Sequence, residues 1–242
     1  MRLLLTLLVI SSIIHIELIA GHPLRGDDAG LIGARRFQIE LLGDYYKSAP
    51  GHSGLMSTAL TFGLNSRSDF ILTLPYHYSR EEEIAHGIGD IVIEYKYLLM
   101  QNEDFNIGVK PILSFGSSNY EKGFGTGKTN YGLNLILTYI SEGFSIHTNL
   151  TGSTNYNYCD EKEGNWNFSI GGEIILSEKL NLLSEFGISN CLSRDKKNNP
   201  IFGLIGLSYN LYENINLSAG VGKDFHDRNS QTNITIGIGI LF

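Results

Sequence analysis

The sequence predicts an all-β protein: a closed, antiparallel, up-and-down transmembrane β-barrel of about 12 strands that follows an N-terminal signal peptide. Three observations predict this fold. Segments of about 9–13 residues alternate apolar and polar side chains with period two, as strands with two different faces do. Their apolar faces often begin or end in aromatic residues. Short turns alternate with longer polar loops along the chain, which is typical of outer-membrane barrels and has no reason to occur in a soluble sandwich.

Residues 1–20 have the layout of a secretory signal peptide. Arg2 precedes an apolar run, and Ala20 offers a small residue for cleavage, although Leu18 is large for the position three residues before the cut. A transmembrane anchor is the weaker interpretation, because the run is short and Glu17 interrupts it. We therefore expect a signal peptide over residues 1–20, a periplasmic segment over residues 21–35 and the barrel over residues 36–242.

The strands follow one another along the whole of the mature chain. Each is about the 9–11 residues that a tilted strand needs to cross a bilayer. We expect them near residues 36–48, 54–64, 68–79, 87–100, 105–117, 129–140, 144–156, 165–176, 180–190, 199–210, 214–223 and 230–242.

The two faces of a strand are clear in residues 87–100. Ile93 and Tyr95 fall on an apolar face, while Glu94 and Lys96 fall on the opposite, polar face. Successive side chains of a strand point to opposite sides of the sheet. The apolar faces are therefore expected to contact lipid, and the polar faces are expected to line the lumen.

The last strand, residues 230–242, is the most regular. We expect Ile236 to face lipid and Thr235 to face the lumen. An even number of strands brings both ends of the barrel to the side of the short turns, which is the periplasmic side. Every backbone group in hydrocarbon must be hydrogen-bonded, so the first and last strands are expected to pair.

Composition excludes several functions. The chain has 242 residues and a formal net charge of −7, so it offers no basic face to nucleic acid. His52, His86 and His226 are scattered in loops without the spacing of metal ligands. No metal site and no cofactor are therefore expected.

Two stretches resemble a phosphate-binding loop and a catalytic site, but neither is predicted to have that function. Residues 123–129, GFGTGKT, lack one glycine of the phosphate-binding loop and precede a strand instead of a helix, so a flexible outer loop is expected. His147 and Asn149 suggest a barrel phospholipase, but we expect no serine beside them and both fall on the lumen face. No catalytic residues are therefore predicted.

Charged side chains on the polar faces are the best functional candidates. They either line a channel or a solute site, or form a salt-bridged plug that fills a narrow barrel. They are Glu40, Asp44, Asp90, Glu94, Lys96, Lys110, Glu173 and Glu185. Their acidic excess predicts a preference for cations if water fills the lumen. If the solute is hydrophobic, the inward side chains expected to line its site are Leu42, Tyr46, Phe202 and Leu204.

Residues 22–30, HPLRGDDAG, connect the signal peptide to the first strand. The segment could fold into the lumen as a short plug, or Asp27 and Asp28 could bind a cation. A flexible periplasmic lead-in is the preferred interpretation.

The two cysteines, Cys159 and Cys191, fall in outer loops one hairpin apart. The oxidising periplasm favours a disulfide between them. The alternative is two thiols whose α-carbons lie more than about 7 Å apart.

Three stretches resemble one family. Residues 22–40 resemble the mature N-terminus, and residues 87–99 the glycine–aspartate strand, of the MetA-pathway phenol-degradation family, often called simply "transporter". The last strand, ending in Phe242, fits as well. The chain departs from the family at Arg25 and Gly26, where a small or apolar residue and a threonine are expected.

The resemblance implies an outer-membrane barrel of a Gram-negative cell that transports small, hydrophobic or aromatic molecules. Its partners would be outer-membrane lipid, the transported solute and the barrel assembly machinery, for which Phe242 resembles the recognition signal. A non-conducting structural or surface-interaction barrel is the alternative.

Overall fold

The computed structural model describes residues 22–47, 51–80, 84–194, 198–225 and 230–242. The predicted signal peptide and His226 lie outside these residues. Within them, no helix has the length and apolar character that crossing a membrane would require. One 3₁₀ helix, η1 (Tyr120–Lys122), accompanies thirteen strands. The strands are β1 (Phe37–Lys47), β2 (His52–Asn65), β3 (Ser68–Arg80), β4 (Ile84–Ile88), β5 (Val92–Gln101), β6 (Phe105–Ser114), β7 (Asn130–Ser141), β8 (Phe144–Thr154), β9 (Gly164–Ser177), β10 (Leu180–Ser189), β11 (Ile201–Tyr212), β12 (Ile215–Phe225) and β13 (Gln231–Leu241).

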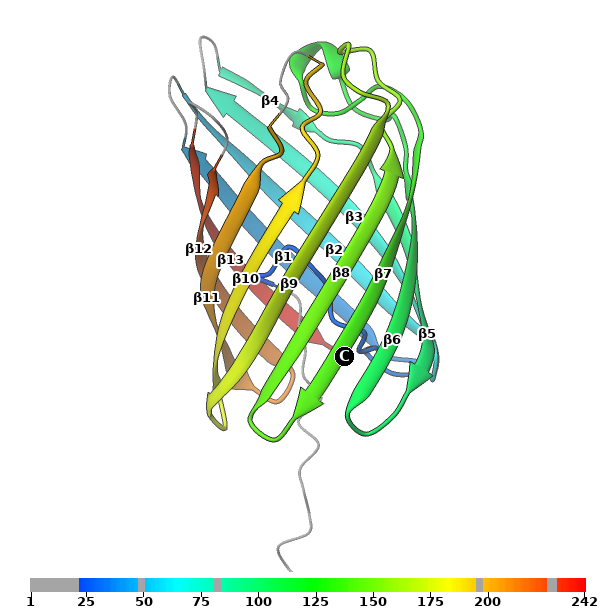
Figure 1. The fold of residues 1–242 in the computed structure, drawn as a ribbon, viewed down its shortest axis with the longest axis vertical. Helices are drawn as coiled ribbons and strands as arrows, with labels where there is room; N and C mark the ends of the chain where they lie inside the picture. The colour runs from blue at the N-terminus through cyan, green and yellow to red at the C-terminus, as the bar shows by residue number, and fades with distance from the viewer. Residues whose placement is uncertain (1–21, 48–50, 81–83, 195–197, 226–229) are drawn as a thin grey trace, which may run out of the picture.

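The strands form one closed antiparallel barrel (Figure 1). Apart from β4 and β5, strands that follow one another in the sequence pair with each other, and β1 pairs with both β2 and β13. Both β4 and β5 pair with β3: β4 pairs with residues 76–80 of β3, and β5 pairs with residues 68–73. Twelve strand positions therefore surround the lumen, and the predicted up-and-down barrel is confirmed.

The strand expected at residues 87–100 is interrupted, which corrects that part of the prediction. Its two pieces, β4 and β5, are separated opposite Pro75 of β3. Proline has no N–H to donate, so the ladder cannot continue there. The carbonyl of Pro75 still accepts a bond of 2.9 Å from the N–H of Gly89.

The closing seam joins the two ends of the barrel. The N–H of Phe242 donates to the carbonyl of Phe37 at 2.8 Å, and the reverse bond is 3.2 Å. The rings of these two residues also stack, with centroids 6.0 Å apart. This pairing, predicted from the regularity of the last strand, leaves no open edge at the seam.

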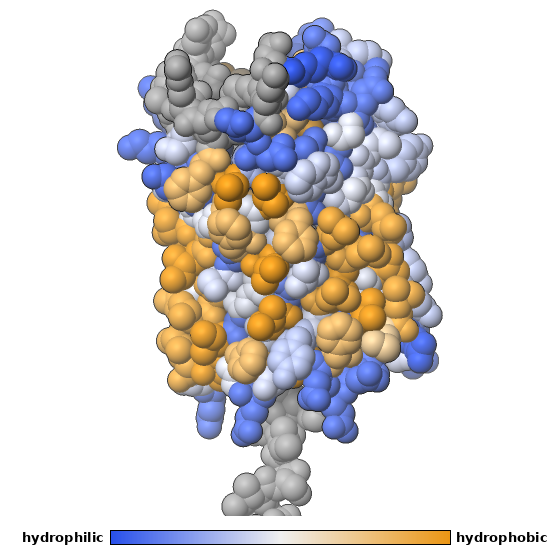
Figure 2. All heavy atoms as spheres, viewed as in Figure 1, coloured by the Kyte–Doolittle hydropathy of each residue, from blue (hydrophilic) through white to orange (hydrophobic). Residues whose placement is uncertain are grey.

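The two faces of the strands are as expected. On β7, Leu135 is 44% exposed, whereas Asn134 is 4% exposed and Ile136 is fully buried. Ile236 likewise points outward and Thr235 inward. Figure 2 shows the outer surface as a broad hydrophobic belt with hydrophilic residues at both ends, as a lipid-facing barrel requires.

Candidate functional site

The lumen is occupied by residues 22–32, called the lumen segment below (Figure 1, blue). The preferred interpretation of these residues as a flexible periplasmic lead-in is therefore wrong. Ala29 is 1% exposed and packs beside Leu98 and Ile136. Its N–H donates to Thr138 Oγ1 at 2.8 Å. The chain folds inward because its backbone groups lack strand partners and the polar wall supplies them.

The barrel wall holds the lumen segment at both of its ends. At the first end, the imidazole of His22 is hydrogen-bonded to Ser218 Oγ at 2.6 Å and to Thr235 Oγ1 at 2.5 Å. At the other end, the N–H of Ile32 donates to Asp69 Oδ2 at 2.9 Å. The contacts come from β12, β13 and β3, so the wall fixes both ends of the segment inside the barrel.

The middle of the lumen segment is held by Glu185 and Asn149. The carboxylate of Glu185 accepts the N–H groups of Arg25 and Gly26 at 2.6 and 2.9 Å. Asn149 accepts the N–H of Asp27 at 3.1 Å and donates to its carbonyl at 2.8 Å. A Cβ on Gly26 would lie 2.7 Å from Asn149 Nδ2, so the departure from the family at this position fits the close approach.

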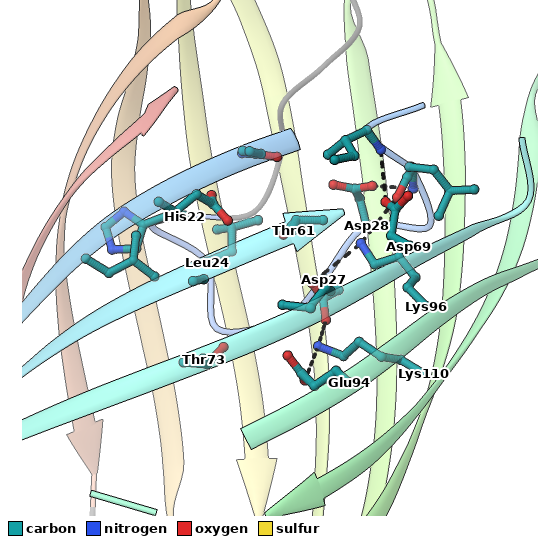
Figure 3. Close-up of a pocket in the computed structure, with 18 of the residues that line it drawn as sticks. His22, Leu24, Asp27, Asp28, Thr61, Asp69, Thr73, Glu94, Lys96 and Lys110 are labelled. Atoms are coloured by element: carbon teal, nitrogen blue, oxygen red, sulfur yellow. Dashed lines mark hydrogen bonds and ion pairs between the residues drawn. The ribbon is translucent and has the colours of Figure 1, made fainter. Parts of the chain in front are cut away.

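A charged cluster joins the lumen segment to β5 and β6 (Figure 3). Lys110 Nζ lies 2.5 Å from Asp27 and 2.7 Å from Glu94, and Lys96 Nζ lies 3.7 Å from Asp27. Burial alone would raise the pKa of Asp27, but Lys110 and Lys96 outweigh it and lower that pKa to about 2. Asp27 is therefore ionised at neutral pH and bridges two lysines.

Arg25, the other departure from the family, forms a second charged contact. Its guanidinium lies 2.7 Å from Asp224 and 4.4 Å from the centre of the Phe202 ring. Planar guanidinium groups stack well on aromatic rings. Arg25 therefore ties the segment to β11 and β12, on the side of the lumen away from Lys110.

A cavity of about 280 Å³ remains between the lumen segment and the wall (Figure 3). The wall residues come from β1, β2, β3, β5 and β6, with Leu241 of β13. The lining of the cavity contains both charged and apolar side chains. The residues that line it are His22, Leu24, Arg25, Gly26, Asp27, Asp28, Gly30, Leu31, Ile32, Gln38, Glu40, Leu42, Ser57, Ala59, Thr61, Asp69, Ile71, Thr73, Glu94, Lys96, Lys110 and Leu241.

The predicted charged candidates divide between this cavity and other places. The four that line the cavity are Glu40, Glu94, Lys96 and Lys110. Asp44 lies on the inner face of β1, opposite Thr235 of β13. Glu173 and Glu185 are buried on β9 and β10, where Glu185 holds the lumen segment and Glu173 Oε2 has no hydrogen-bond partner.

Asp90 does not line the lumen in the way expected. It lies in the gap between β4 and β5, and its carboxylate accepts the N–H groups of Ser118 and Thr126 at 3.1 and 2.9 Å. The interruption of the strand turns Asp90 toward the outer loop. Its place is therefore to hold residues 115–129 at the outer end of the barrel.

That loop includes the glycine-rich residues 123–129. Phe124 is buried and stacks on His77, with ring centroids 5.8 Å apart. Gly123 and Gly127 have positive φ angles of 73° and 71°, which glycine adopts without strain. The stretch is a loop, as expected, and Asp90 and Phe124 fold it against the barrel.

Among the apolar candidates, Leu42 lines the cavity. Phe202 and Leu204 are buried inside the barrel beyond it, and Phe202 carries Arg25. Asp69 was not among the predicted candidates. The alternation of residues 68–79 contains the signal, because it places Asp69 on the same face as Ile71 and Thr73, away from Phe70.

His147 has a serine beside it, contrary to expectation. Ser145 Oγ lies 3.1 Å from His147 Nε2, and Nδ1 lies 3.2 Å from Thr138 Oγ1. Both Ser145 and His147 are buried. A catalytic triad has a carboxylate beside Nδ1 of its histidine, whereas His147 has the neutral hydroxyl of Thr138 there. The arrangement is a hydrogen-bond network within the wall.

The remaining expectations concern the cysteines and metals. Cys159 and Cys191 are not joined by a disulfide: Cys159 is exposed in its loop, whereas Cys191 is buried. The carbonyl of Cys191 accepts a bond from Lys162 Nζ at 2.9 Å, which fixes its backbone there. The described part of the chain contains no cluster of three or more histidine, cysteine or acidic side chains placed to hold a metal ion.

Comparison with solved structures gives barrels of the same fold. The COG4313 outer membrane channel from Pseudomonas putida F1 is 12% identical, with a TM-score of 0.68 over 89% of this chain and 97% of that one. The NanC porin is 11% identical, with a TM-score of 0.62 over 84% and 98%. The KdgM porin in complex with disordered oligogalacturonate is 15% identical, with a TM-score of 0.56 over 84% and 98%.

At sequence level, no curated protein matches the chain. A family match nevertheless covers most of it, from the middle of the lumen segment to the end of β13. The chain belongs to the family described as "Putative MetA-pathway of phenol degradation", which matches residues 27–240.

Proposed function

We propose that this protein is a channel of the Gram-negative outer membrane that passes small molecules, hydrophobic or aromatic ones among them. The observation that carries the proposal is the cavity of about 280 Å³ inside the barrel, between the lumen segment and the wall. Small-molecule sites usually measure about 300–1,000 Å³, so this cavity suits only small solutes.

The names of the similar structures support a channel. The COG4313 protein is called an outer membrane channel, and NanC and KdgM are called porins. The family description refers to phenol degradation, which supports an aromatic solute. In this chain, Leu24, Leu42 and Ile71 offer apolar contacts to such a ring.

The lumen segment sets the expected width of the path. It lies inside the barrel and is hydrogen-bonded at both ends and in the middle. Ions and solutes must therefore pass beside it or displace it. We expect a small conductance with a preference for cations, because the cavity lining contains more carboxylates than basic groups.

A structural barrel is the second candidate. It is favoured by the buried packing of Ala29 against Leu98 and Ile136 and by the ion pairs of Lys110. Such a barrel would use its outer loops, including the folded residues 115–129, and would conduct nothing.

Reconstitution distinguishes the two candidates. The full chain is refolded into planar bilayers for conductance and into liposomes for swelling with solutes of increasing size. A small, cation-preferring current that Glu40→Gln weakens and Glu173→Gln leaves unchanged supports the channel, because only Glu40 lines the cavity. Folded protein that neither conducts, nor admits solutes, nor binds aromatic ligands would leave the structural barrel.

A further inference from the structure

We propose that the cavity binds small amphipathic cations, in which an ammonium group is attached to an aromatic or alkyl body. Asp28, Glu40 and Asp69 would face the ammonium group. The inference rests on the proposed function, since it names the class of solute for that same path. Three features of the cavity carry it: unbalanced charge, a buried oxygen without a partner, and an apolar side.

The charge of the cavity lining is unbalanced. Its basic groups already have partners: Lys110 contacts Asp27 and Glu94, Lys96 faces Asp27, and Arg25 contacts Asp224. In the part of the chain that the structure describes, no ion pair involves Asp28, Glu40 or Asp69. Carboxylates that are gathered in a confined, partly apolar space are costly without a cation.

Asp69 is the second and independent feature. Its side chain is 2% exposed, and Oδ2 accepts the N–H of Ile32. The other oxygen, Oδ1, is buried without a hydrogen-bond partner, although the residue lines the cavity (Figure 3). A buried acceptor without a donor is unfavourable. An ammonium group brings three donors and a positive charge, which would satisfy it.

The rest of the lining is apolar. Leu24, Leu31, Leu42, Ala59 and Ile71 surround the same space. They would contact the uncharged body of the ligand, and the volume of about 280 Å³ limits that body to about one ring. A bare metal ion is the poorer occupant, because the described acidic residues do not converge closely enough to coordinate one.

Benzylamine and benzyl alcohol provide matched probes, since they share a ring and differ in charge at neutral pH. Binding of each to the refolded full chain in detergent is measured by calorimetry. We expect benzylamine to bind at least about tenfold more tightly, as a hydrogen bond to a charged group allows. The double variant Glu40→Gln with Asp69→Asn should remove that preference and leave the affinity for benzyl alcohol unchanged.

The control variant is Glu173→Gln, which removes a buried lumen carboxylate outside the cavity lining and should keep the preference. Heat-modifiable migration in gels checks folding. If the double variant does not fold, Glu40→Gln alone is used, since no hydrogen bond or ion pair holds the Glu40 carboxylate among the described residues. It should weaken benzylamine binding about threefold or more.

Equal binding of the two probes to the unaltered protein would overturn the inference. So would a preference that survives in the folded variants. If benzyl alcohol passes or binds and benzylamine binds no more tightly, the proposed channel function is supported and the proposed cation site is rejected. If neither probe binds or passes, the proposed function fails as well.

Discussion

The Nζ atom of Lys110 lies 2.5 Å from a carboxylate oxygen of Asp27, and this contact joins the lumen segment to the barrel wall. Lys110 also contacts Glu94 at 2.7 Å, so one lysine links a residue before the first strand to two strands near the middle of the chain. Most of its side chain is buried. Among the described residues, removing the Asp27 charge would leave Lys110 with Glu94 alone and Lys96 without an ion pair, and a buried charge that loses its partner is costly.

Asp27→Asn should therefore destabilise the protein and loosen the lumen segment. We expect a loss of about 3 kcal/mol in the free energy of unfolding, together with a larger conductance. Asp160→Asn is the matched control: Asp160 pairs with Arg194 at 3.0 Å on an exposed loop, so its loss should cost less than about 1 kcal/mol. Denaturant titration measures the first effect, and planar-bilayer recording measures the second. Equal costs for the two variants would contradict the assigned role of Asp27.

Acid should also loosen the lumen segment, through His22. Burial lowers the pKa of His22 from 6.5 to about 4. Between these pH values the buried imidazole is therefore neutral, whereas an imidazole released into water takes up a proton. The stabilisation is complete above pH 6.5 and is lost as the pH falls toward about 4. Conductance should rise over that window in the unaltered protein. In His22→Asn the rise should be smaller, and an identical rise would assign it to other groups.

Leu74 and Thr73 test the two faces of β3 at adjacent positions. Leu74 is exposed on the outer face, and Thr73 lines the cavity. An arginine near the middle of the lipid face costs about 2–4 kcal/mol, whereas an arginine beside carboxylates in the lumen should cost much less. Folding of Leu74→Arg and Thr73→Arg into liposomes measures the difference. Equal costs, or the reverse order, would mean that the faces are wrongly assigned.

Phe242 remains a prediction as the signal for barrel assembly. Phe242→Ala should lower the amount of folded barrel in cells, while Phe225→Ala, which removes another exposed phenylalanine at the outer end of β12, should not. Both variants should fold alike in liposomes if recognition is the cause. A comparable loss for Phe242→Ala in liposomes would instead assign its role to the seam with Phe37.

The fold was predictable because each strand carries its own signal. Alternation along residues 129–140 is enough to place Leu135 outside and Asn134 inside, whichever strands lie beside them. The interruption between β4 and β5 was not predicted, since it depends on Pro75 in another strand. Local alternation contains no information about such a partner.

The sequence offered a lumen plug as an alternative for residues 22–30 but could not favour it over a periplasmic lead-in, for a similar reason. Residues 22–32 have neither strand nor helix periodicity, and their partners are spread from Asp69 on β3 to Thr235 on β13. Asp27 meets Lys110 and Asn149 only after the barrel has closed. The sequence did indicate the polar faces that receive the segment, and it therefore predicted four of the charged wall residues around the cavity, and Leu42 among the apolar ones.

The central claim is that the lumen segment sits inside the barrel and bounds the cavity. A cysteine pair at Ala29 and Gly108 tests it directly, because a Cβ on Gly108 would lie 3.5 Å from that of Ala29, within disulfide range. Cys159 and Cys191 are first replaced by serine. As a control, Gly152 has nothing within 4 Å of its Cβ position, so Ala29→Cys with Gly152→Cys should stay unlinked.

The measurement is mass spectrometry of a non-reduced digest of the folded protein, taken from membranes after mild oxidation. The account predicts that the peptides containing residues 29 and 108 are joined in most molecules of Ala29→Cys with Gly108→Cys. Two fully alkylated thiols in a barrel shown to be folded would contradict it, and would place the segment outside the lumen.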